Sequence, residues 1–364
     1  MKWILMVLIG MVVIAIMIIK FCSFLGIKPS PEKAKTFHKS QNFRNGKFVN
    51  QIPIDTSKSI KGVFAVLWGK ISKQPRLRPD HEIPIKSLNE RLVNPIEGTT
   101  LTWFGHSAFL LVMNGTTILL DPMFGKYSYP IPLFGSKRYN EKLPMEIEQF
   151  PHIDVVLISH DHYDHLDELS IKKLKDKVKL FCVPLGVGSH LERWGVDPHQ
   201  IKEYDWWDEM NMNGIMLAAT PAIHTSGRGM SDSNTTLWCS WVIKGKQTKL
   251  YFSGDSGYGP HFKQIGRQYG PFDITLMQCG QYDERWATTH MYPEQAIQAH
   301  LDVQGKVMIP MHWGTFTLAF HDWTEPIERV LIAARDQGVE ISTPRIGEMV
   351  RVHAKMYPDS PWWK

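Results

Sequence analysis

The segment "SHDHYDHLD", from Ser159 to Asp167, places three histidines and three aspartates within nine residues. It directly follows "IDVVLI" (153–158), a short apolar run that is typical of a buried strand. The segment is therefore either a solvated loop that happens to be rich in histidine, or a loop through which the strand delivers ligands to a metal. The positions of the other histidines and aspartates distinguish these two interpretations.

Single titratable residues also follow three other apolar runs. His224 follows "IMLAATPAI", Asp255 follows "KLYFSG", and His312 follows "KVMIPM". Strand ends of an α/β sheet share one rim, and binding sites are commonly built there. We therefore expect these side chains to meet those of 159–167, and the pattern favours a metal site over a solvated loop.

The local spacing suggests how the ligands divide. In an extended chain, residues two apart point the same way, so His160 and His162 face one cation together. A turn after Tyr163 directs the next two residues toward a second cation. The predicted ligands are His160, His162 and His224 for one cation, Asp164, His165 and His312 for the other, and Asp255 as a bridge between them.

Nitrogen and oxygen ligands without sulfur suit Zn²⁺, with Mn²⁺ and Fe as alternatives. Two such ions a few ångströms apart would hold a bridging water and lower its pKa. We therefore expect a hydrolytic centre with two zinc ions.

The composition limits the partners. The 364 residues carry a net charge of +5 without a basic block, so no nucleic acid is expected as a partner. The four cysteines are scattered and are expected to be free thiols: Cys22, Cys182, Cys239 and Cys279.

The N-terminus predicts a membrane anchor. Trp3–Ile19 is an unbroken apolar run of 17 residues, preceded by a single charge at Lys2. A cleaved signal peptide is the alternative, but no Ala-x-Ala cleavage site follows the run. We expect a single-pass anchor over residues 1–25. The lysines that follow it favour a catalytic domain on the cytoplasmic side.

The remaining chain reads as a linker and one domain. Residues 28–62 are rich in Lys, Ser, Asn and Pro, and are either a linker or an arm that covers the main domain. Strand and helix patterns then alternate, and Asn114-Gly115 is suited to a tight hairpin turn. We expect a linker and N-terminal extension over 26–95, and one α/β domain over 96–364.

Several motifs resemble those of one known family. The segments "WFGHSAFLL", "LDPMF", "ISHDHYDHLD", "DWWDE", "SGDSGYG" and "HWGTFTLA" are similar to the N-acyl-phosphatidylethanolamine-hydrolysing phospholipases D, which have the metallo-β-lactamase fold. The resemblance runs from about Trp103 to His321, and weakly to Gly347. It implies an αββα sandwich, a two-zinc site with the ligands named above, and hydrolysis of a phosphodiester on the head-group side.

The resemblance also implies roles for further residues. His106 and Asp121 would orient the ligand imidazoles, and His290 would contact the phosphate or assist the leaving group, beside Asp164 and Asp255 as catalytic residues. The segments "GQYDERW" and "HTSGRG" depart from the family pattern, which puts the substrate more in doubt than the chemistry.

The expected function is a zinc-dependent phosphodiesterase that releases N-acylethanolamine and phosphatidic acid. The alternatives are a lactonase or a small-phosphodiester hydrolase on the same metals, and a non-catalytic zinc-binding membrane protein. The expected partners are a phospholipid or other phosphodiester, the membrane and, in a homodimer, a second copy of the chain.

Overall fold

The apolar runs form two sheets of seven strands each. We describe residues 22–54, 75–88, 98–133, 135–229 and 231–364 of a computed structural model, together with Trp3, Met6 and Gly10. The first sheet has the order β16 (Met349–Arg351), β3 (Thr100–Trp103), β4 (Phe109–Met113), β5 (Thr116–Leu120), β6 (Ile153–Leu157), β7 (Val178–Pro184), β8 (Ile201–Tyr204). The second has the order β15 (Glu340–Ile341), β14 (Gly305–Met311), β13 (Phe272–Gln278), β12 (Lys249–Phe252), β11 (Ser240–Lys244), β10 (Ile215–Thr220), β9 (Glu209–Met212).

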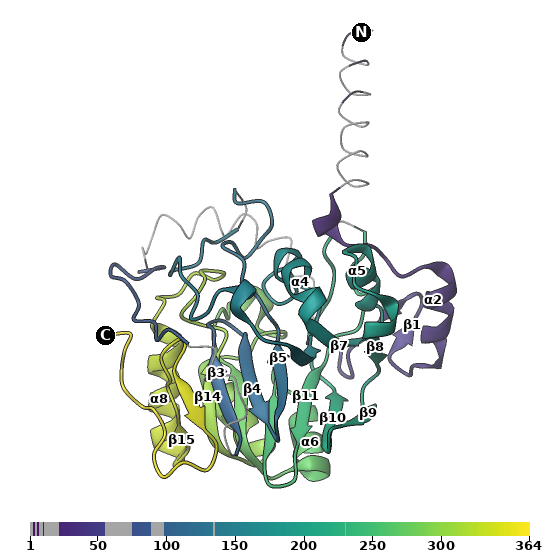
Figure 1. Cartoon of the computed structure of the whole chain (residues 1–364). Helices are drawn as coiled ribbons and strands as arrows, with labels where there is room; N and C mark the ends of the chain where they lie inside the picture. Colours follow the sequence, from purple (N-terminus) through teal and green to yellow (C-terminus); the bar gives the residue numbers. More distant parts are fainter. Residues whose placement is uncertain are drawn as a thin grey trace.

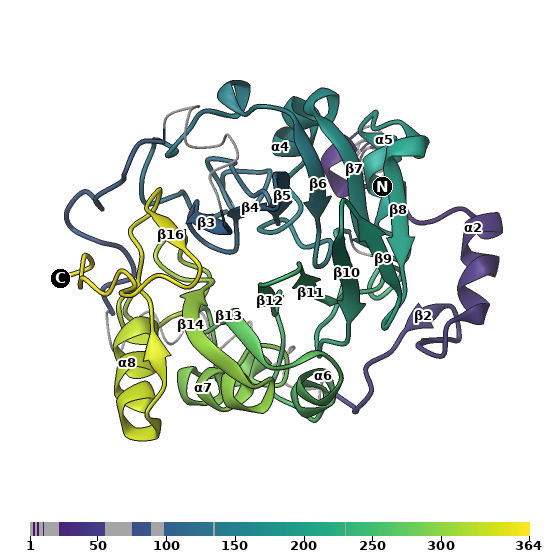
Figure 2. The same cartoon turned by 60° about the horizontal axis from the view of Figure 1, so that its bottom comes forward.

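Helices cover the outer face of each sheet. α4 (Glu168–Leu174) and α5 (Gly188–Arg193) lie over the first sheet, and α6 (His261–Tyr269), α7 (Pro293–Asp302) and α8 (Glu325–Gln337) lie over the second (Figures 1 and 2). The result is the mixed α/β sandwich of metallo-β-lactamase type that the sequence predicts.

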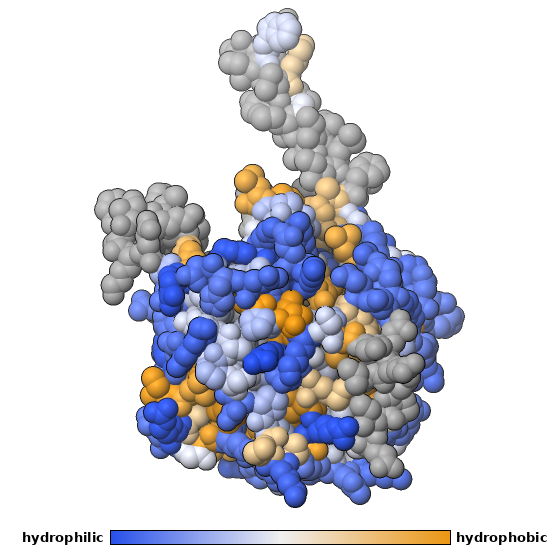
Figure 3. All heavy atoms as spheres, turned by 60° about the vertical axis from the view of Figure 1, so that its left-hand side comes forward, coloured by the Kyte–Doolittle hydropathy of each residue, from blue (hydrophilic) through white to orange (hydrophobic). Residues whose placement is uncertain are grey.

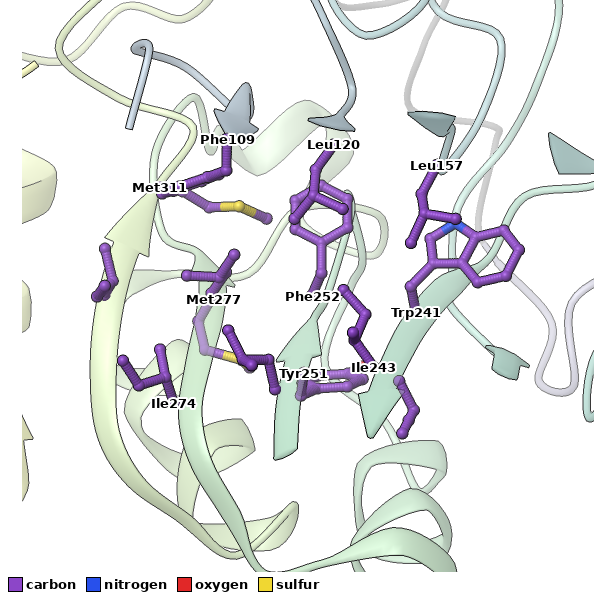
Figure 4. Packing of buried hydrophobic residues seen from close by; sticks show 14 of the residues in the cluster. Phe109, Leu120, Leu157, Trp241, Ile243, Tyr251, Phe252, Ile274, Met277 and Met311 are labelled. Atoms are coloured by element: carbon purple, nitrogen blue, oxygen red, sulfur yellow. The ribbon is translucent and has the colours of Figure 1, made fainter. Parts of the chain in front are cut away.

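Side chains of the first sheet alternate between two hydrophobic cores. Phe109 and Leu120 point toward the second sheet, where they meet side chains such as Phe252 and Met311 (Figure 4). Their neighbours Leu110 and Leu119 belong to the core on the other face, together with residues of α4 and α5. Because both faces are buried, these strands read as continuous apolar runs rather than as alternating ones.

Strand direction brings the site residues to one edge of each sheet. β5, β6, β7 and β8 are parallel, and β3 has their direction because β3 and β5 are both antiparallel to β4. Likewise β12, β13, β14 and β15 are parallel, and β10 has their direction because β10 and β12 are both antiparallel to β11. The strands that precede the predicted ligands therefore end together.

Local turns agree with the sequence. β4 and β5 form the predicted hairpin, in which Asn114 and Gly115 have φ of 50° and 73°, the left-handed conformation that such a turn requires. The segment "DELSIKKLKDKV" (167–178) is typical of a single helix, but α4 ends at Leu174, and a 3-10 turn leads directly into β7.

The described part of the N-terminal extension covers the domain. α2 (Pro31–Thr36) and the hairpin of β1 (Phe43–Arg44) and β2 (Lys47–Phe48) lie beside the first sheet (Figure 2). Phe37, Phe43 and Phe48 are buried and belong to the main core. The segment 28–54 is thus an arm that packs on the domain.

The predicted anchor lies almost wholly outside the described residues, apart from Trp3, Met6, Gly10 and residues 22–25. Within the part of the chain that the structure describes, no helix is both long and apolar enough to span a bilayer. Cys182, Cys239 and Cys279 are buried, Cys22 is partly exposed, and all four are free thiols. On the face drawn in Figure 3, hydrophilic side chains cover most of the described surface.

Candidate metal centre

The loops that leave the shared edge carry the predicted ligands. They follow β6, β10, β12 and β14, and the loops after β3 and β5 add the two predicted orienting residues. The side chains brought together are His160, His162, Asp164, His165, His224, Asp255 and His312, with His106 and Asp121 beside them.

The first group consists of His160, His162 and His224, whose donor atoms lie within 4.8 Å of one another. The Nε2 atom of His224 is 3.1 Å from Nδ1 of His162. A cation between the three rings would be bound by three imidazole nitrogens, as the sequence predicts for one of the two ions.

The second group consists of Asp164, His165 and His312, with His106 close by, and its donor atoms also lie within 4.8 Å of one another. Asp255 stands between the groups. Its Oδ2 atom is 3.2 Å from Nε2 of His165 and 3.0 Å from Nε2 of His312. A carboxylate oxygen of Asp255 also lies within 4.8 Å of a ring nitrogen of His224, so this carboxylate reaches both groups.

Hydrogen bonds on the outer ring nitrogens orient the imidazoles. Nδ1 of His165 lies 2.7 Å from Asp121 Oδ2, and Nδ1 of His160 lies 2.9 Å from the Ser159 hydroxyl. Nδ1 of His224 and of His312 lie 3.2 Å and 3.3 Å from backbone carbonyl oxygens. Each ring thereby directs Nε2 toward the centre, the arrangement by which outer partners fix metal-binding histidines.

The unsatisfied polar atoms test whether a metal fits. Nε2 of His160 and Oδ1 of Asp255 are buried and have no hydrogen-bond partner among the residues that the structure describes. Leaving such a group unpaired costs about 1–3 kcal/mol. Neutral imidazoles and carboxylates that converge on one space are the donor set that Zn²⁺ prefers, so the residues present fit a divalent cation.

The electrostatics set the protonation states of the predicted ligands. Burial and the neighbouring imidazoles lower the pKa of His160 and of His224 well below its usual range. Burial alone would raise the pKa of Asp164 and of Asp255, but the adjacent His165 holds both well below the usual value. The first group therefore offers neutral rings, and both carboxylates are ionised, the forms that bind cations. In the second group, Asp255 and Asp164 outweigh burial and raise the pKa of His165 well above its usual range and that of His312 to about 9, so a cation bound there would displace a proton.

His106 and Asp121 lie behind the ligands in strained backbone. Nε2 of His106 is 2.9 Å from Asp164 Oδ2, and Asp121 accepts hydrogen bonds from the Ser159 amide at 2.7 Å and from His165. Their φ angles are 54° and 36°, and His312 has φ of 67°. Such conformations cost of order 1–3 kcal/mol each and gather at functional sites.

His290 lies at the open side of the centre. Its Nε2 atom is 3.3 Å from Asp255 Oδ2, and its side chain is 16% exposed, whereas those of Asp255 and His312 are almost fully buried. His290 is thus a predicted site residue that solvent or a substrate can reach.

Several residues that support the site gave no signal in the sequence. Thr289 and Gly280 contribute backbone carbonyl oxygens, which accept from His224 and His312. Asn50 lies 174 residues from His224, yet its side chain bonds both the amide and the carbonyl of His224. Backbone acceptors leave no mark on residue type, and a lone distant asparagine has no spacing to reveal it.

Comparison with known proteins identifies the family of this chain. Residues 116–313 match the family model described as the beta-lactamase superfamily domain. The chain belongs to the metallo-β-lactamase superfamily. An N-acyl-phosphatidylethanolamine-hydrolyzing phospholipase D of Caenorhabditis elegans is 32% identical over 273 residues, 71% of this chain and 76% of that protein. The chain thus also belongs with this phospholipase D group, among metal-dependent hydrolases.

Two further relatives and one solved structure extend the comparison. An uncharacterised protein of Mycobacterium tuberculosis is 39% identical and covers 89% of this chain and 88% of its own length. An outer membrane protein, RomA, of Klebsiella pneumoniae is 49% identical over 100 residues, 28% of this chain and 75% of that protein. The structure of Igni18, a metallo hydrolase from Ignicoccus hospitalis, shares the fold, with a TM-score of 0.53 at 24% identity over 71% of this chain and 99% of that chain.

Proposed function

We propose that this chain is a membrane-associated phosphodiesterase with two zinc ions, which hydrolyses N-acyl-phosphatidylethanolamine to N-acylethanolamine and phosphatidic acid. The observation that supports it most is the position of Asp255, whose Oδ2 atom lies 3.0–3.3 Å from His165, His290 and His312 and within ligand distance of His224. One carboxylate that reaches both groups suits two ions held close together.

Zinc ions bound here would supply Lewis-acid stabilisation of phosphoryl oxygens and a water activated at neutral pH. His160, His162 and His224 would hold one ion, and Asp164, His165 and His312 the other. Asp121 keeps His165 in the tautomer that presents Nε2 to the centre, since its carboxylate accepts from Nδ1. A hydrogen bond between Nε2 of His106 and Oδ2 of Asp164 holds that carboxylate in position.

The partly exposed His290 is positioned for the substrate. Because its Nε2 atom faces both Asp255 and the open side of the site, it can donate a proton to the leaving ethanolamide oxygen or a hydrogen bond to the phosphate. Asp164 and Asp255 would act as catalytic carboxylates by fixing the reacting groups. The reaction breaks the P–O bond to the ethanolamide, and water supplies the new oxygen of phosphatidic acid.

An apolar cavity beside the site supports a lipid substrate. A cavity of about 230 Å³ has an aromatic and aliphatic part and a charged part. The first is lined by Phe24, Tyr127, Tyr129, Tyr163 and Leu169, and the second by Lys126, Asp167, Glu168 and Arg228. Tyr163 lies between His162 and Asp164 in the sequence. An aromatic and aliphatic lining suits an acyl chain better than it suits a small polar ester.

Exposed hydrophobic residues that line this cavity or lie within three residues of its lining support a location at the membrane. Leu133 is 85% exposed, Leu169 is 64% exposed and Ile27 is 46% exposed. In Figure 3, hydrophobic side chains gather near the top of the view, where the described chain begins. We propose a single-pass anchor over 1–25 with the catalytic domain on the cytoplasmic side. The extension then covers 26–95 and the hydrolase domain 96–364. This arrangement also allows a homodimer.

The experiment is product analysis by mass spectrometry. The full-length, zinc-loaded protein is given N-acyl-phosphatidylethanolamine in mixed micelles, beside an Asp255→Ala variant. We expect N-acylethanolamine and phosphatidic acid from the wild type only. Absence of both products, with zinc-dependent hydrolysis of a lactone or a simple phosphodiester, would assign a different substrate to the same centre.

A further inference from the structure

The residue between the first two histidines is itself buried and fully bonded. Asp161 is 1% exposed, and its Oδ1 atom accepts from the Gly227 amide at 2.8 Å. Its Oδ2 atom accepts from the Thr236 hydroxyl at 2.7 Å. Since Gly227 follows His224 by three residues, this carboxylate ties the loop of His160 and His162 to the loop of His224. All three histidines of the first group therefore depend on it.

A second histidine supports Asp161 from behind. Nε2 of His190, on α5, lies 3.2 Å from Asp161 Oδ2, and His190 is 1% exposed. Nδ1 of His190 accepts a hydrogen bond from the backbone amide of Ile27 at 3.0 Å. Because a backbone amide only donates, Nδ1 is the acceptor and Nε2 holds the proton that it donates to Asp161.

Ile27 belongs to the segment Cys22–Ile27, which directly follows the apolar N-terminal run and makes further bonds of this kind. The Ser23 carbonyl accepts from the Trp194 indole at 2.8 Å, and the Phe24 carbonyl accepts from Nε of Arg228 at 3.0 Å. The Ser23 hydroxyl donates to Glu168 at 2.5 Å. The 22–27 segment is thus bonded to three elements around the first group.

Arg228 transmits one of these contacts to the metal loop. Its Nη1 atom donates to the carbonyl oxygens of Asp161 at 2.7 Å and of Leu166 at 2.8 Å, at the two ends of the ligand-bearing loop. Its guanidinium lies over the rings of Tyr163 and Trp194, with centroid distances of 4.1 Å and 4.9 Å. The buried Arg228 thereby holds the loop curved around the metal positions.

Gly26 lets the segment approach this closely. It has φ of 67°, and a Cβ added to it would lie 2.1 Å from Nδ1 of His190. Any side chain at this position would displace either the segment or the histidine. The contact between the 22–27 segment and His190 therefore requires glycine at residue 26.

We propose that the 22–27 segment is a positioning element of the metal centre. Through His190 and Asp161, and through Arg228, it holds the loop of His160 and His162 against the loop of His224. The position of the N-terminal segment is thus coupled to the geometry of the site. A force or a partner that displaces residues 22–27 would separate the two ligand loops and weaken cation binding by His160, His162 and His224. The inference rests on the proposed metal centre but not on the identity of the substrate.

The test uses the full-length chain with Gly26→Ala, and Gly338→Ala as its matched control. Both glycines have φ of 67°, but a Cβ at Gly338 would meet no atom of the described residues within 4 Å. Zinc affinity is measured by chelator competition, and the absorption spectrum of the cobalt-substituted protein reports the ligand geometry. We expect Gly26→Ala to lower the affinity of one zinc by roughly 10–100-fold and to alter the cobalt spectrum, and Gly338→Ala to change neither.

A second pair of variants keeps the test valid if Gly26→Ala does not fold. His190→Gln retains a donor toward Asp161, whereas His190→Leu removes it. We expect the glutamine to preserve most of the zinc affinity and the leucine to lose it. Wild-type affinity and spectrum in both Gly26→Ala and His190→Leu would overturn the inference. A wild type that takes up no metal would instead disprove the proposed centre, and the inference with it.

Discussion

The Nδ1 atom of His162 faces Nε2 of His224 at 3.1 Å, and two neutral imidazoles hold that geometry only with a proton or a cation between them. We predict that His162→Ala removes one of two zinc ions and lowers the turnover more than 100-fold, because a ligand of the first group is lost. Metal analysis and kinetics measure this. The exposed His199 provides the control: His199→Ala should retain both ions and full activity.

A buried histidine outside the site predicts how stability depends on pH. Burial lowers the pKa of His300 to about 4, and its Nδ1 atom lies 2.7 Å from the Thr275 hydroxyl. The unfolded chain binds this proton first, near pH 6.5, so stability that is present above pH 6.5 is lost as the pH falls toward 4.

We expect protonation of His300 to lower the free energy of unfolding by roughly 2 kcal/mol as the pH falls from 7 to 5. Urea unfolding of the wild type and of His300→Gln at both pH values measures it. The variant should lose less stability than the wild type over this interval. Equal losses in the two proteins would show that His300 is not buried in its neutral form.

Residue types alone identified the ligand candidates because metal chemistry limits the choice to histidine and carboxylate. The structure brings all of the predicted ligands into one rim. Of the residues that support them, His106 and Asp121 were predicted from the family resemblance, whereas the others were not. Asp161 appears in the sequence as one more polar residue of a histidine-rich loop, and only the fold reveals that both of its oxygens are buried and bonded.

At the scale of elements, the ends of β13 and β14 must approach closely to place His312. A Cβ on Gly280 would lie 2.2 Å from the carbonyl oxygen of His312, and the Gly280 carbonyl accepts from the His312 ring. We predict that Gly280→Ala displaces His312 and lowers the affinity of the second zinc by at least tenfold, as metal titration would measure. Gly46→Ala, with open space around it, should leave both ions bound, and an unchanged second zinc in Gly280→Ala would contradict the account.

Strand positions were largely predictable, whereas helix ends were not. Continuous apolar runs predict buried strands, and β6, β10, β12 and β14 lie in the runs that the sequence indicated. α4 is shorter than predicted because the charged residues after Leu174 form a 3-10 turn instead of another helical turn. The pairing order of the two sheets depends on contacts between distant segments, which local patterns do not report.

At the scale of the molecule, the proposed membrane face predicts a change that depends on the substrate. Leu169 is 64% exposed on α4, next to Glu168, which accepts from the Ser23 hydroxyl. We predict that Leu169→Asp lowers the rate on phospholipid vesicles several-fold, because a charge at the bilayer surface opposes apolar contact, and leaves the rate on a soluble phosphodiester unchanged. Ile332→Asp, at a 57% exposed position on α8, is the control and should change neither rate. Equal rates of the wild type and Leu169→Asp on vesicles would show that α4 does not face the membrane.

The central claim is that water attacks phosphorus at this centre. The most direct measurement is hydrolysis of N-acyl-phosphatidylethanolamine in ¹⁸O-labelled water, with the products analysed by mass spectrometry. The account predicts one ¹⁸O atom in phosphatidic acid and none in N-acylethanolamine. Label in the N-acylethanolamine, or in a released fatty acid, would contradict it, because a carbon–oxygen or an amide bond would then be the one that breaks.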